Sequence, residues 1–400
     1  MSRNRIKDQI AIVGVSSLPR TRDGNRTARS LVAEACVQAI RDAGLKREDI
    51  DGIVSSAGPG HWLIVPPGVT EMTATLRLPN ITYLNDGMGV VVSPLIDAMN
   101  AIFSGACETV LVYHYNYRTP FNSKLAAEDP FRRGFRGYDD YPAENVKNAT
   151  AYTAWCARYM HENNVPREAL GRVAINDRTN ALRNPLAAMG SKPLTMEDYL
   201  NARMVRDPLT MFDMDLPVDA ADAFILTTAE RARDLPHTPV LISHAVQGLC
   251  ETASDEDQLA SLAHHGQDVV VRQLKQKGAR GLADVNDTDI AMIYDGFTFI
   301  SLSWYEKLGW CGPGEAGAFI EQNWNAQQNR LLLNGRIPVN TNGGMLSEGG
   351  TQGAGFVREA VVQLRGDAGE RQVPDAKSVF LANGGFFYNS QAAVFRRDDS

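Results

Sequence analysis

The sequence predicts an α/β fold made of two similar lobes. Apolar runs of strand length alternate with segments of helical apolar spacing, first over residues 10–115 and again after residue 239. A strand, an Asp-Gly turn and an apolar helix occur in this order twice, at residues 81–99 and 290–304. Because 400 residues exceed one ordinary core, we expect a duplicated unit.

The first lobe begins with a strand at residues 10–15 (IAIVGV), whose continuous apolar run is typical of a strand buried on both faces. A helix follows at residues 27–43, and Gly44 can end it in a left-handed conformation. Residues 50–57 and 109–115 add two short strands around the first strand–turn–helix unit. The alternation of strands and helices favours a mainly parallel sheet.

The second lobe repeats this order. The N-terminal lobe is predicted to span residues 1–236, with an inserted loop region at about 116–217, and the C-terminal lobe residues 237–400. Residues 116–148 have few periodic signals, and long segments of this kind usually serve a site or an interface. In the second lobe, a glycine-rich loop at residues 339–355 leads into a helix.

Composition and charge exclude several classes of function. The net charge is −7 and the pI about 5.6, without a long basic run, so we expect no nucleic-acid partner. No apolar stretch has the length of a membrane-spanning helix. Five cysteines without CxxC spacing indicate reduced thiols and a cytoplasmic protein. Metal-ligand and nucleotide-binding spacings are also absent, so we expect no metal and no cofactor in this chain.

The two Asp-Gly turns suggest where a site would form. If the lobes pack with pseudo-two-fold symmetry, Asp86-Gly87 and Asp295-Gly296 should face each other. Both helix N-termini would then point into one cleft. Free backbone N–H groups and positive dipole ends there would stabilise a developing oxyanion.

Five stretches, in their order and spacing, resemble the thiolase superfamily over nearly all of the chain. They are IAIVGVSS, ARSLVAEACVQAIRDAGL, DPLTMFDMDLPVDAADAFILTTAERARDL, IYDGFT and VNTNGGMLSEG. The resemblance is to the branch of sterol-carrier-protein thiolases and lipid-transfer-protein-like, CoA-dependent aldolases. It implies a thiolase fold, with two duplicated βαβ-type lobes packed as αβαβα layers.

The resemblance also implies that thiolase catalysis is lost. The position of the acylated cysteine falls on Met88 or Gly89, and Tyr294 stands where thiolases have an asparagine. Gly350 stands where the family has a histidine, and residues 381–385 lack the C-terminal cysteine. Claisen chemistry through an acyl-cysteine needs a thiolate and a group that activates it. This chain has neither at those positions.

Members of the aldolase branch also lack the cysteine and carry Tyr-Asp-x-Phe-Thr, as residues 294–298 do. The implied activity is retro-aldol cleavage of a β-hydroxyacyl-CoA in lipid or steroid degradation. By analogy with the branch, the acyl group would carry a steroid-like or aryl side chain. The products would be a ketone or aldehyde and a shorter acyl-CoA. A second tyrosine, usual in that branch, is replaced here by Gly350.

The same resemblance implies the partners. We expect a homodimeric core joined by a small OB-fold, zinc-ribbon protein that supplies part of the acyl-CoA site, hence a heterotetramer. The coenzyme A thioester is then the substrate, and any zinc belongs to the partner only.

Tyr294 is the main catalytic candidate, because a retro-aldol step must remove a proton from a β-hydroxyl. The alternative is a strand-end tyrosine that bonds locally. Asp295 is a candidate too, although a turn or N-cap role that holds the fold is the stronger interpretation. Backbone at five positions could bind the thioester oxyanion, unless these loops are only structural: Met88, Gly89, Gly344, Gly350 and Gly385.

Four polar side chains are candidates to replace the missing catalytic groups, with buried hydrogen bonding as the alternative for each: Glu348, Gln352, His114 and Tyr388. Two other functions stay open beside the lyase. One is a non-catalytic pseudo-thiolase subunit or acyl-CoA- or lipid-binding protein. The other is a thiolase-like acyltransferase that works without an acyl-cysteine.

Overall fold

The computed structural model describes residues 4–22, 24–56, 67–87, 90–118, 148–250, 265–279, 285–385 and 390–399. A nine-stranded sheet dominates this part of the chain, in the order β3-β2-β4-β7-β1-β8-β14-β13-β9. Its strands are β1 (Ile10–Ser17), β2 (Gly52–Ser55), β3 (Tyr83–Asp86), β4 (Thr109–Asn116), β7 (Ala220–Thr228), β8 (Val240–Gly248), β9 (Ile290–Ile293), β13 (Ser378–Asn383) and β14 (Ser390–Arg397).

The helices are α1 (Ala28–Asp42), α2 (Val69–Leu76), α3 (Val92–Ser104), α7 (Asn148–Asn163), α8 (Arg167–Ala181), α9 (Met196–Leu200), α10 (Ala229–Ala232), α11 (Gly266–Lys277), α12 (Thr298–Leu308), α13 (Ala316–Gln322) and α14 (Ala354–Arg365). Short strands β5 (Met204–Arg206) and β6 (Leu209–Thr210) form a hairpin. A small second sheet contains β10 (Trp324–Asn325), β11 (Arg330–Leu333) and β12 (Ile337–Pro338).

The strand order is the same in both halves of the chain, read from the centre of the sheet outward. In the first half it is β1, β7, β4, β2, and in the second half β8, β14, β13, β9. The halves meet where β1 pairs antiparallel with β8 through Ala11 and Ile12. This mirrored order confirms the predicted duplication.

The sheet is mixed, so the prediction of a mainly parallel sheet was wrong. In each half a returning strand, β7 or β14, runs antiparallel to both of its neighbours. Only β2 with β3, β2 with β4, and β9 with β13 are parallel among the described strands of this sheet. The direction of a strand depends on the path of the long connection that precedes it, and apolar periodicity does not reveal this path.

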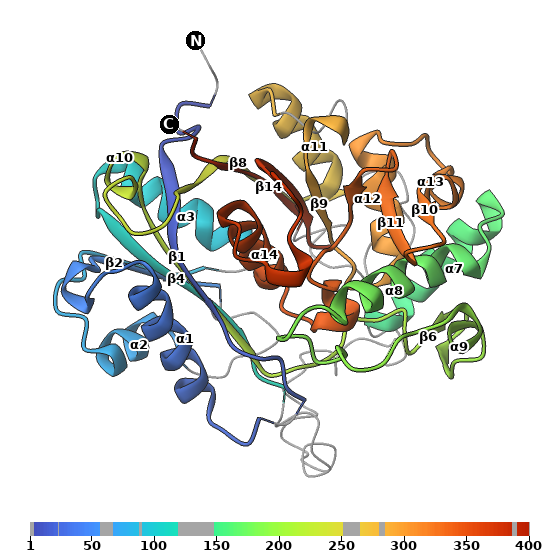
Figure 1. Cartoon of the computed structure of the whole chain (residues 1–400), viewed down its shortest axis with the longest axis horizontal. Coiled ribbons are helices and arrows are strands. Elements are labelled where there is room, and N and C mark those ends of the chain that lie inside the picture. Colours follow the sequence, from blue (N-terminus) through green and yellow to red (C-terminus); the bar gives the residue numbers. More distant parts are fainter. Residues whose placement is uncertain are drawn as a thin grey trace.

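The helices form the layers expected of the thiolase fold. Helix α1 packs on β1, β4 and β7, and α11 packs on β8 and β14. Between them, α3 and α14 each contact strands of both halves, as Figure 1 shows near the centre of the molecule. The apolar face of α1, which includes Leu31, Val32 and Cys36, is buried, as the helical spacing predicts. The order of layers is therefore αβαβα.

The two Asp-Gly turns do not occupy equivalent places, so the expectation that they face each other was wrong. β9, before Asp295, has the position of β2, whereas β3, before Asp86, lies one place further out. In the second half that outer place is taken by Val339, which pairs in parallel with Ala291 of β9. The counterpart of α3 is therefore α14, and the backbone N–H of Val91 donates to the Gln352 carbonyl at 3.4 Å where their N-termini meet.

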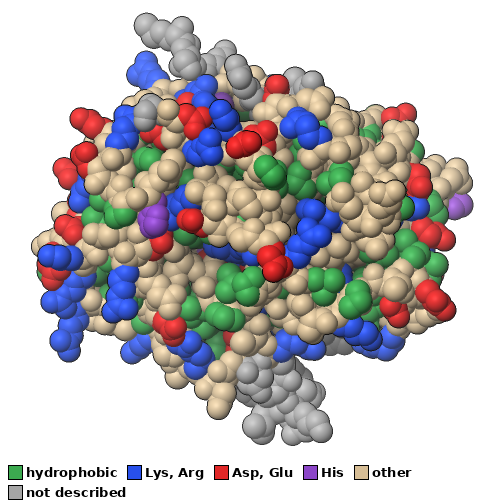
Figure 2. Space-filling view, in the orientation of Figure 1, with side chains coloured by type: hydrophobic (Ala, Val, Ile, Leu, Met, Phe, Trp, Pro, Cys, Tyr) green, Lys and Arg blue, Asp and Glu red, His purple; other side chains and the backbone are tan. Residues whose placement is uncertain are grey.

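The segment between β4 and β7 of the first half carries α7, α8 and α9, and α8 packs against α12 and β11 of the second half. The predicted lobe boundary at residues 236–237 falls between α10 and β8, and it stays a prediction. No helix in the described ranges is long and apolar enough to cross a membrane. Acidic and basic side chains are interspersed on the face in Figure 2, with small hydrophobic patches between them.

Candidate active site

Tyr294 follows β9 directly and is held by its backbone. Its N–H donates to the Ala382 carbonyl at 2.9 Å, and its own carbonyl accepts from Ser301 Oγ at 3.1 Å. The side chain is 9% exposed, and its ring lies over Gly296, where an added Cβ would come within 2.6 Å of the phenol oxygen. The strand end and the missing side chain at position 296 together fix the phenol.

Asp295 holds a neighbouring turn of the chain. Its carboxylate is buried and accepts the N–H groups of Met345 (2.9 Å) and Leu346 (3.0 Å) at the start of the helical turn Gly344–Glu348. Desolvation and the adjacent Asp295 charge raise the pKa of buried Asp177 well above its usual range. Burial also raises the pKa of Asp295 to about 6, although it accepts a hydrogen bond from Asp177. The pair therefore shares a proton, with Asp177 as the neutral partner.

The predicted thioester donor Gly344 lies in that turn. Its N–H donates to Asn342 Oδ1 at 3.2 Å, and its φ of 62° suits glycine. A Cβ there would collide with the carboxylates of Asp295 and Asp177. Glycine is thus needed for close packing on the acidic pair, and the amide is bonded within the chain.

Gly350 is part of a tight junction between three segments. Its N–H donates to the Leu216 carbonyl at 2.8 Å, and its carbonyl accepts from Asn116 Nδ2 at the end of β4. A Cβ at position 350 would fall well inside 3.0 Å of Asp215 Oδ2. The space that a side chain at Gly350 would use is therefore filled by the carboxylate of Asp215.

Asp215 is the residue that the sequence analysis missed. Its backbone N–H donates to the Gly296 carbonyl at 2.9 Å, beside the ring of Tyr294. The side chain is partly exposed, and desolvation raises the pKa of its carboxyl, with the charge of Arg118 opposing this shift. A cluster of aspartates at positions 213, 215 and 219 was visible in the sequence, but its proximity to residue 350 was not.

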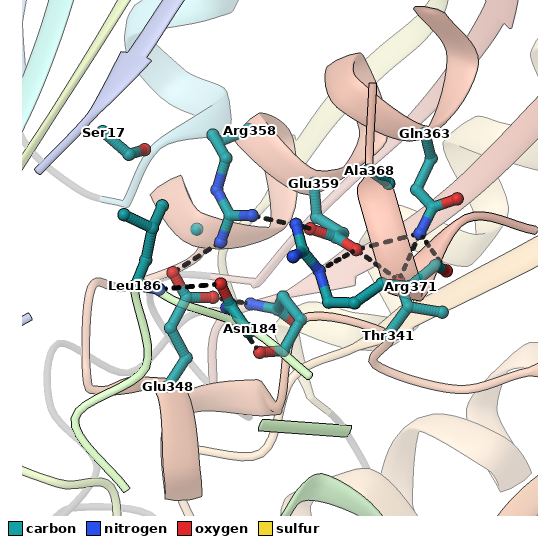
Figure 3. Close-up of polar contacts among 12 residues, drawn as sticks. Ser17, Asn184, Leu186, Thr341, Glu348, Arg358, Glu359, Gln363, Ala368 and Arg371 are labelled. Atoms are coloured by element: carbon teal, nitrogen blue, oxygen red, sulfur yellow. Dashed lines mark hydrogen bonds and ion pairs between the residues drawn. The ribbon is translucent and has the colours of Figure 1, made fainter. Parts of the chain in front are cut away.

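Glu348, predicted as a polar replacement, belongs to a buried ion network. Its carboxylate contacts Arg358 Nη2 at 2.5 Å and Arg20 Nη2 at 3.1 Å. Figure 3 shows Arg358 of α14 pointing between Glu348 and Glu359. The ion pairs continue through Arg20 to Asp222 and through Glu359 to Arg371. Three arginines and three carboxylates thus balance, which favours buried bonding over catalysis for Glu348.

An open hollow of about 670 Å³ lies on the outer side of this network. It is lined by residues 182–188, 190 and 191 and by parts of α14 and the following turn, including Arg358 and Arg371. Neither Tyr294 nor Asp215 is among its lining residues.

The remaining candidates lie at different places. His114 is buried at the end of β4, and its Nδ1 bonds Ser56 Oγ. Gln352 has a φ of 51°, and its carbonyl accepts from Asn383 Nδ2 at 3.1 Å. Gly385 is buried and accepts from Ser390 Oγ at 2.7 Å. The structure thus places Gln352 near the N-termini of α3 and α14. Three predicted residues lie outside the described ones: Met88, Gly89 and Tyr388.

Four of the five thiols are poor candidates for a replacement nucleophile. Burial raises the pKa of Cys107 and of Cys311 to about 12, and it also raises the pKa of Cys36 and of Cys156. A buried thiol with a raised pKa is a poor source of thiolate. Within the described ranges, no group of three histidine, cysteine, aspartate or glutamate side chains could hold a metal ion.

Comparisons with known proteins agree with this geometry. Residues 260–397 match the family model "Thiolase C-terminal domain-like". The chain is 31% identical, over 90% of its length and 92% of the relative's, to the 17-hydroxy-3-oxo-4-pregnene-20-carboxyl-CoA lyase of Mycobacterium tuberculosis. It is also 31% identical to the steroid side-chain-cleaving aldolase of Thermomonospora curvata, over 94% of each chain. A solved structure, the Ltp2-ChsH2(DUF35) aldolase, superposes with a TM-score of 0.83 at 27% identity over 99% of both chains.

Proposed function

Because this chain belongs to the thiolase superfamily, in its branch of sterol-carrier-protein-like aldolases, we propose that it is a CoA-dependent carbon–carbon lyase. Its reaction is retro-aldol cleavage of a β-hydroxyacyl-CoA to a ketone or aldehyde and a shorter acyl-CoA. The observation that carries the proposal is Tyr294, a phenol fixed over Gly296 at the end of β9.

The chemistry asks for proton transfer and enolate stabilisation. The β-hydroxyl loses its proton, the Cα–Cβ bond breaks, and its electron pair moves into the thioester enolate, which is then protonated at Cα. Tyr294 would transfer one of these protons. Backbone N–H groups near the start of α3, including those of Met88 and Gly89, are proposed as donors to the enolate oxygen.

The substrate and the partner are proposed from the relatives. One of them is named for a steroid carboxyl-CoA, which supports a bulky, steroid-like acyl group here. The structure solved as an Ltp2-ChsH2(DUF35) aldolase supports an OB-fold partner that completes the acyl-CoA site. Any zinc would be held by that partner. The five free cysteines support a reducing, cytoplasmic location.

The test uses the chain co-purified with the proposed OB-fold partner. The complex is given 17-hydroxy-3-oxo-4-pregnene-20-carboxyl-CoA and a 3-aryl-3-hydroxyacyl-CoA, and free carbonyl and shorter acyl-CoA are measured. We expect equimolar products from the wild type and a loss of about 10²–10⁴-fold in kcat for Tyr294→Phe. Tyr305→Phe, a buried tyrosine on α12 whose hydroxyl has no described hydrogen bond, is the matched control.

A wild-type complex that forms no carbonyl product from either thioester would overturn the lyase. Binding of acyl-CoA without turnover would then favour the non-catalytic subunit. Full activity in Tyr294→Phe would leave the lyase standing and remove the role of Tyr294.

We also propose a homodimer, supported by the exposed edge of the sheet. β3 ends the described nine-stranded sheet, and Leu84 on it is 54% exposed. An edge strand with an exposed apolar side chain readily pairs with another chain. Light scattering should give a dimer for the wild type and for the control Val205→Lys, 43% exposed elsewhere, and a shift toward monomer for Leu84→Lys. A monomeric wild type would refute the dimer.

A further inference from the structure

Asp215 is clamped between the two segments that form the candidate site. On one side its N–H bonds the Gly296 carbonyl, and the adjacent Met214 pairs with Phe297. On the other side, Leu216 donates to the Met345 carbonyl at 3.1 Å and accepts from Gly350. Position 215 is therefore fixed relative to Tyr294 and to the glycine loop without any bond to its own side chain.

Asp213 makes this placement rigid. It accepts from the hydroxyls of Tyr199 (2.6 Å) and Thr298 (2.8 Å), and its carbonyl accepts the Thr298 N–H at 3.1 Å. Thr298 begins α12, the helix that follows the Tyr294 turn. The loop that carries Asp215 is thus attached to the element that carries the phenol, which holds both groups in one geometry.

The carboxylate of Asp215 is unusual among the acidic groups around it. Asp213, Asp295 and Glu348 each accept at least two hydrogen bonds or ion pairs. The side chain of Asp215 is partly exposed and has no hydrogen bond or ion pair among the described residues. Arg118 is the described charged group that acts on the carboxylate electrostatically. A partly desolvated carboxylate without a hydrogen-bond or ion-pair partner does not stabilise the fold.

From this geometry we infer that Asp215 is a catalytic residue, the general base that removes the substrate's β-hydroxyl proton while Tyr294 serves as the acid. The inference rests on the proposed lyase function and deepens it. The Asp215 carboxylate accepts the hydroxyl proton, the Cα–Cβ electron pair forms the thioester enolate, and the Tyr294 hydroxyl protonates Cα. Return of the proton from Asp215 to the phenolate restores both groups, so the cycle needs no co-reactant.

The division of roles follows from the acidities of the two groups. A carboxylate is ionised and able to accept a proton near neutral pH, whereas an ordinary phenol keeps its proton there. Desolvation makes Asp215 a stronger base than an exposed aspartate. Gly350 completes the arrangement, because any side chain at that position would displace the carboxylate.

The test compares Asp215→Asn, Asp215→Glu and Gly350→Ala with the wild-type complex, using the substrates above. We expect kcat to fall at least 100-fold in Asp215→Asn, with partial recovery in Asp215→Glu. Gly350→Ala should lower kcat at least 10-fold by displacing the carboxylate. The acid limb of the kcat/KM–pH profile should disappear in Asp215→Asn, a change that a purely structural role would not produce. Asp234→Asn, exposed in the turn after α10, is the control.

The outcomes separate this inference from the proposed function. An active wild type, with Asp215→Asn within about 3-fold of it or with an unchanged acid limb, overturns the role of Asp215 alone. An inactive wild type overturns the lyase and this inference with it. If Asp215→Asn fails to fold, Gly350→Ala decides: full activity there overturns the inference.

Discussion

Two carboxylates flank the glycine loop at residues 349–350, and the protein uses them in opposite ways. Glu348 is 1% exposed and contacts Arg20, Arg358 and Asn342. The carboxylate of Asp215, which lies against Gly350, has no hydrogen bond or ion pair within the described ranges. A neutralised carboxylate stabilises the fold, and one left without a partner can exchange a proton with a substrate. The presence or absence of a partner therefore distinguishes carboxylates that hold the fold from those available for catalysis better than burial does.

Of the substitutions that test this contrast, Glu348→Gln should have the largest effect on stability. The substitution keeps the shape but leaves the buried network, three arginines and three carboxylates, with an excess positive charge. We expect the free energy of unfolding to fall by about 3–5 kcal/mol, because an uncompensated buried charge is costly. Urea unfolding measures this loss.

Its control is Glu162→Gln, which removes an exposed ion pair with Arg158 on α7. That change should alter the free energy of unfolding by no more than about 0.5 kcal/mol. Equal losses in the two variants would mean that the network around Glu348 is no more important than a surface pair.

The next largest effect on stability is expected when the two Asp-Gly turns are compared. Asp295→Asn puts an amide opposite the N–H groups of Met345 and Leu346, so one of them loses its acceptor, and we expect a loss of about 2–3 kcal/mol. Among the described residues Asp86 accepts the Val69 N–H, and its side chain is half-buried, so Asp86→Asn should lose about 1 kcal/mol. Thermal unfolding in parallel would show whether the turns differ. A larger loss at Asp86 would contradict this ranking.

The sequence predicts the layers of the fold and Tyr294 because both depend on local signals. Apolar periodicity places helices and strands, and the Tyr-Asp-x-Phe-Thr stretch places the phenol at a strand end. Asp215 and the ion network stayed hidden because they depend on contacts between distant segments. Asp215 approaches Gly350 across 135 positions, and Arg20 reaches Glu348 across 328. The equivalence of α3 and α14 also needed the strand order, which the sequence does not reveal.

A smaller effect concerns the pH dependence of the Asp177–Asp295 pair. Burial raises both pKa values above those of the unfolded chain, so the folded state binds more protons and stability falls as the pH rises from about 4 through 6. Asp177→Asn mimics the neutral partner and keeps a donor toward Asp295. We expect little change at pH 4.5 and a gain of about 1–2 kcal/mol at pH 8, measured by urea unfolding. A pH dependence identical to the wild type would contradict the shared proton.

Asp215→Asn should have the smallest effect on stability, and it is the most direct test of the difference between Asp215 and Glu348. Because desolvation raises the pKa of Asp215, its ionised form destabilises the folded state at pH values above the unfolded pKa, near 4. Asp215→Asn removes this charge, so at pH 7.5 the variant should be as stable as the wild type or more stable, by up to about 1 kcal/mol. Arg118 attracts the carboxylate and limits that gain. Thermal unfolding at pH 4.5 and 7.5 measures the difference, which should vanish at the lower pH. A destabilised Asp215→Asn would place Asp215 with Glu348, among the groups that hold the fold. A stable variant that has lost activity would show that the protein keeps this carboxylate for its chemistry.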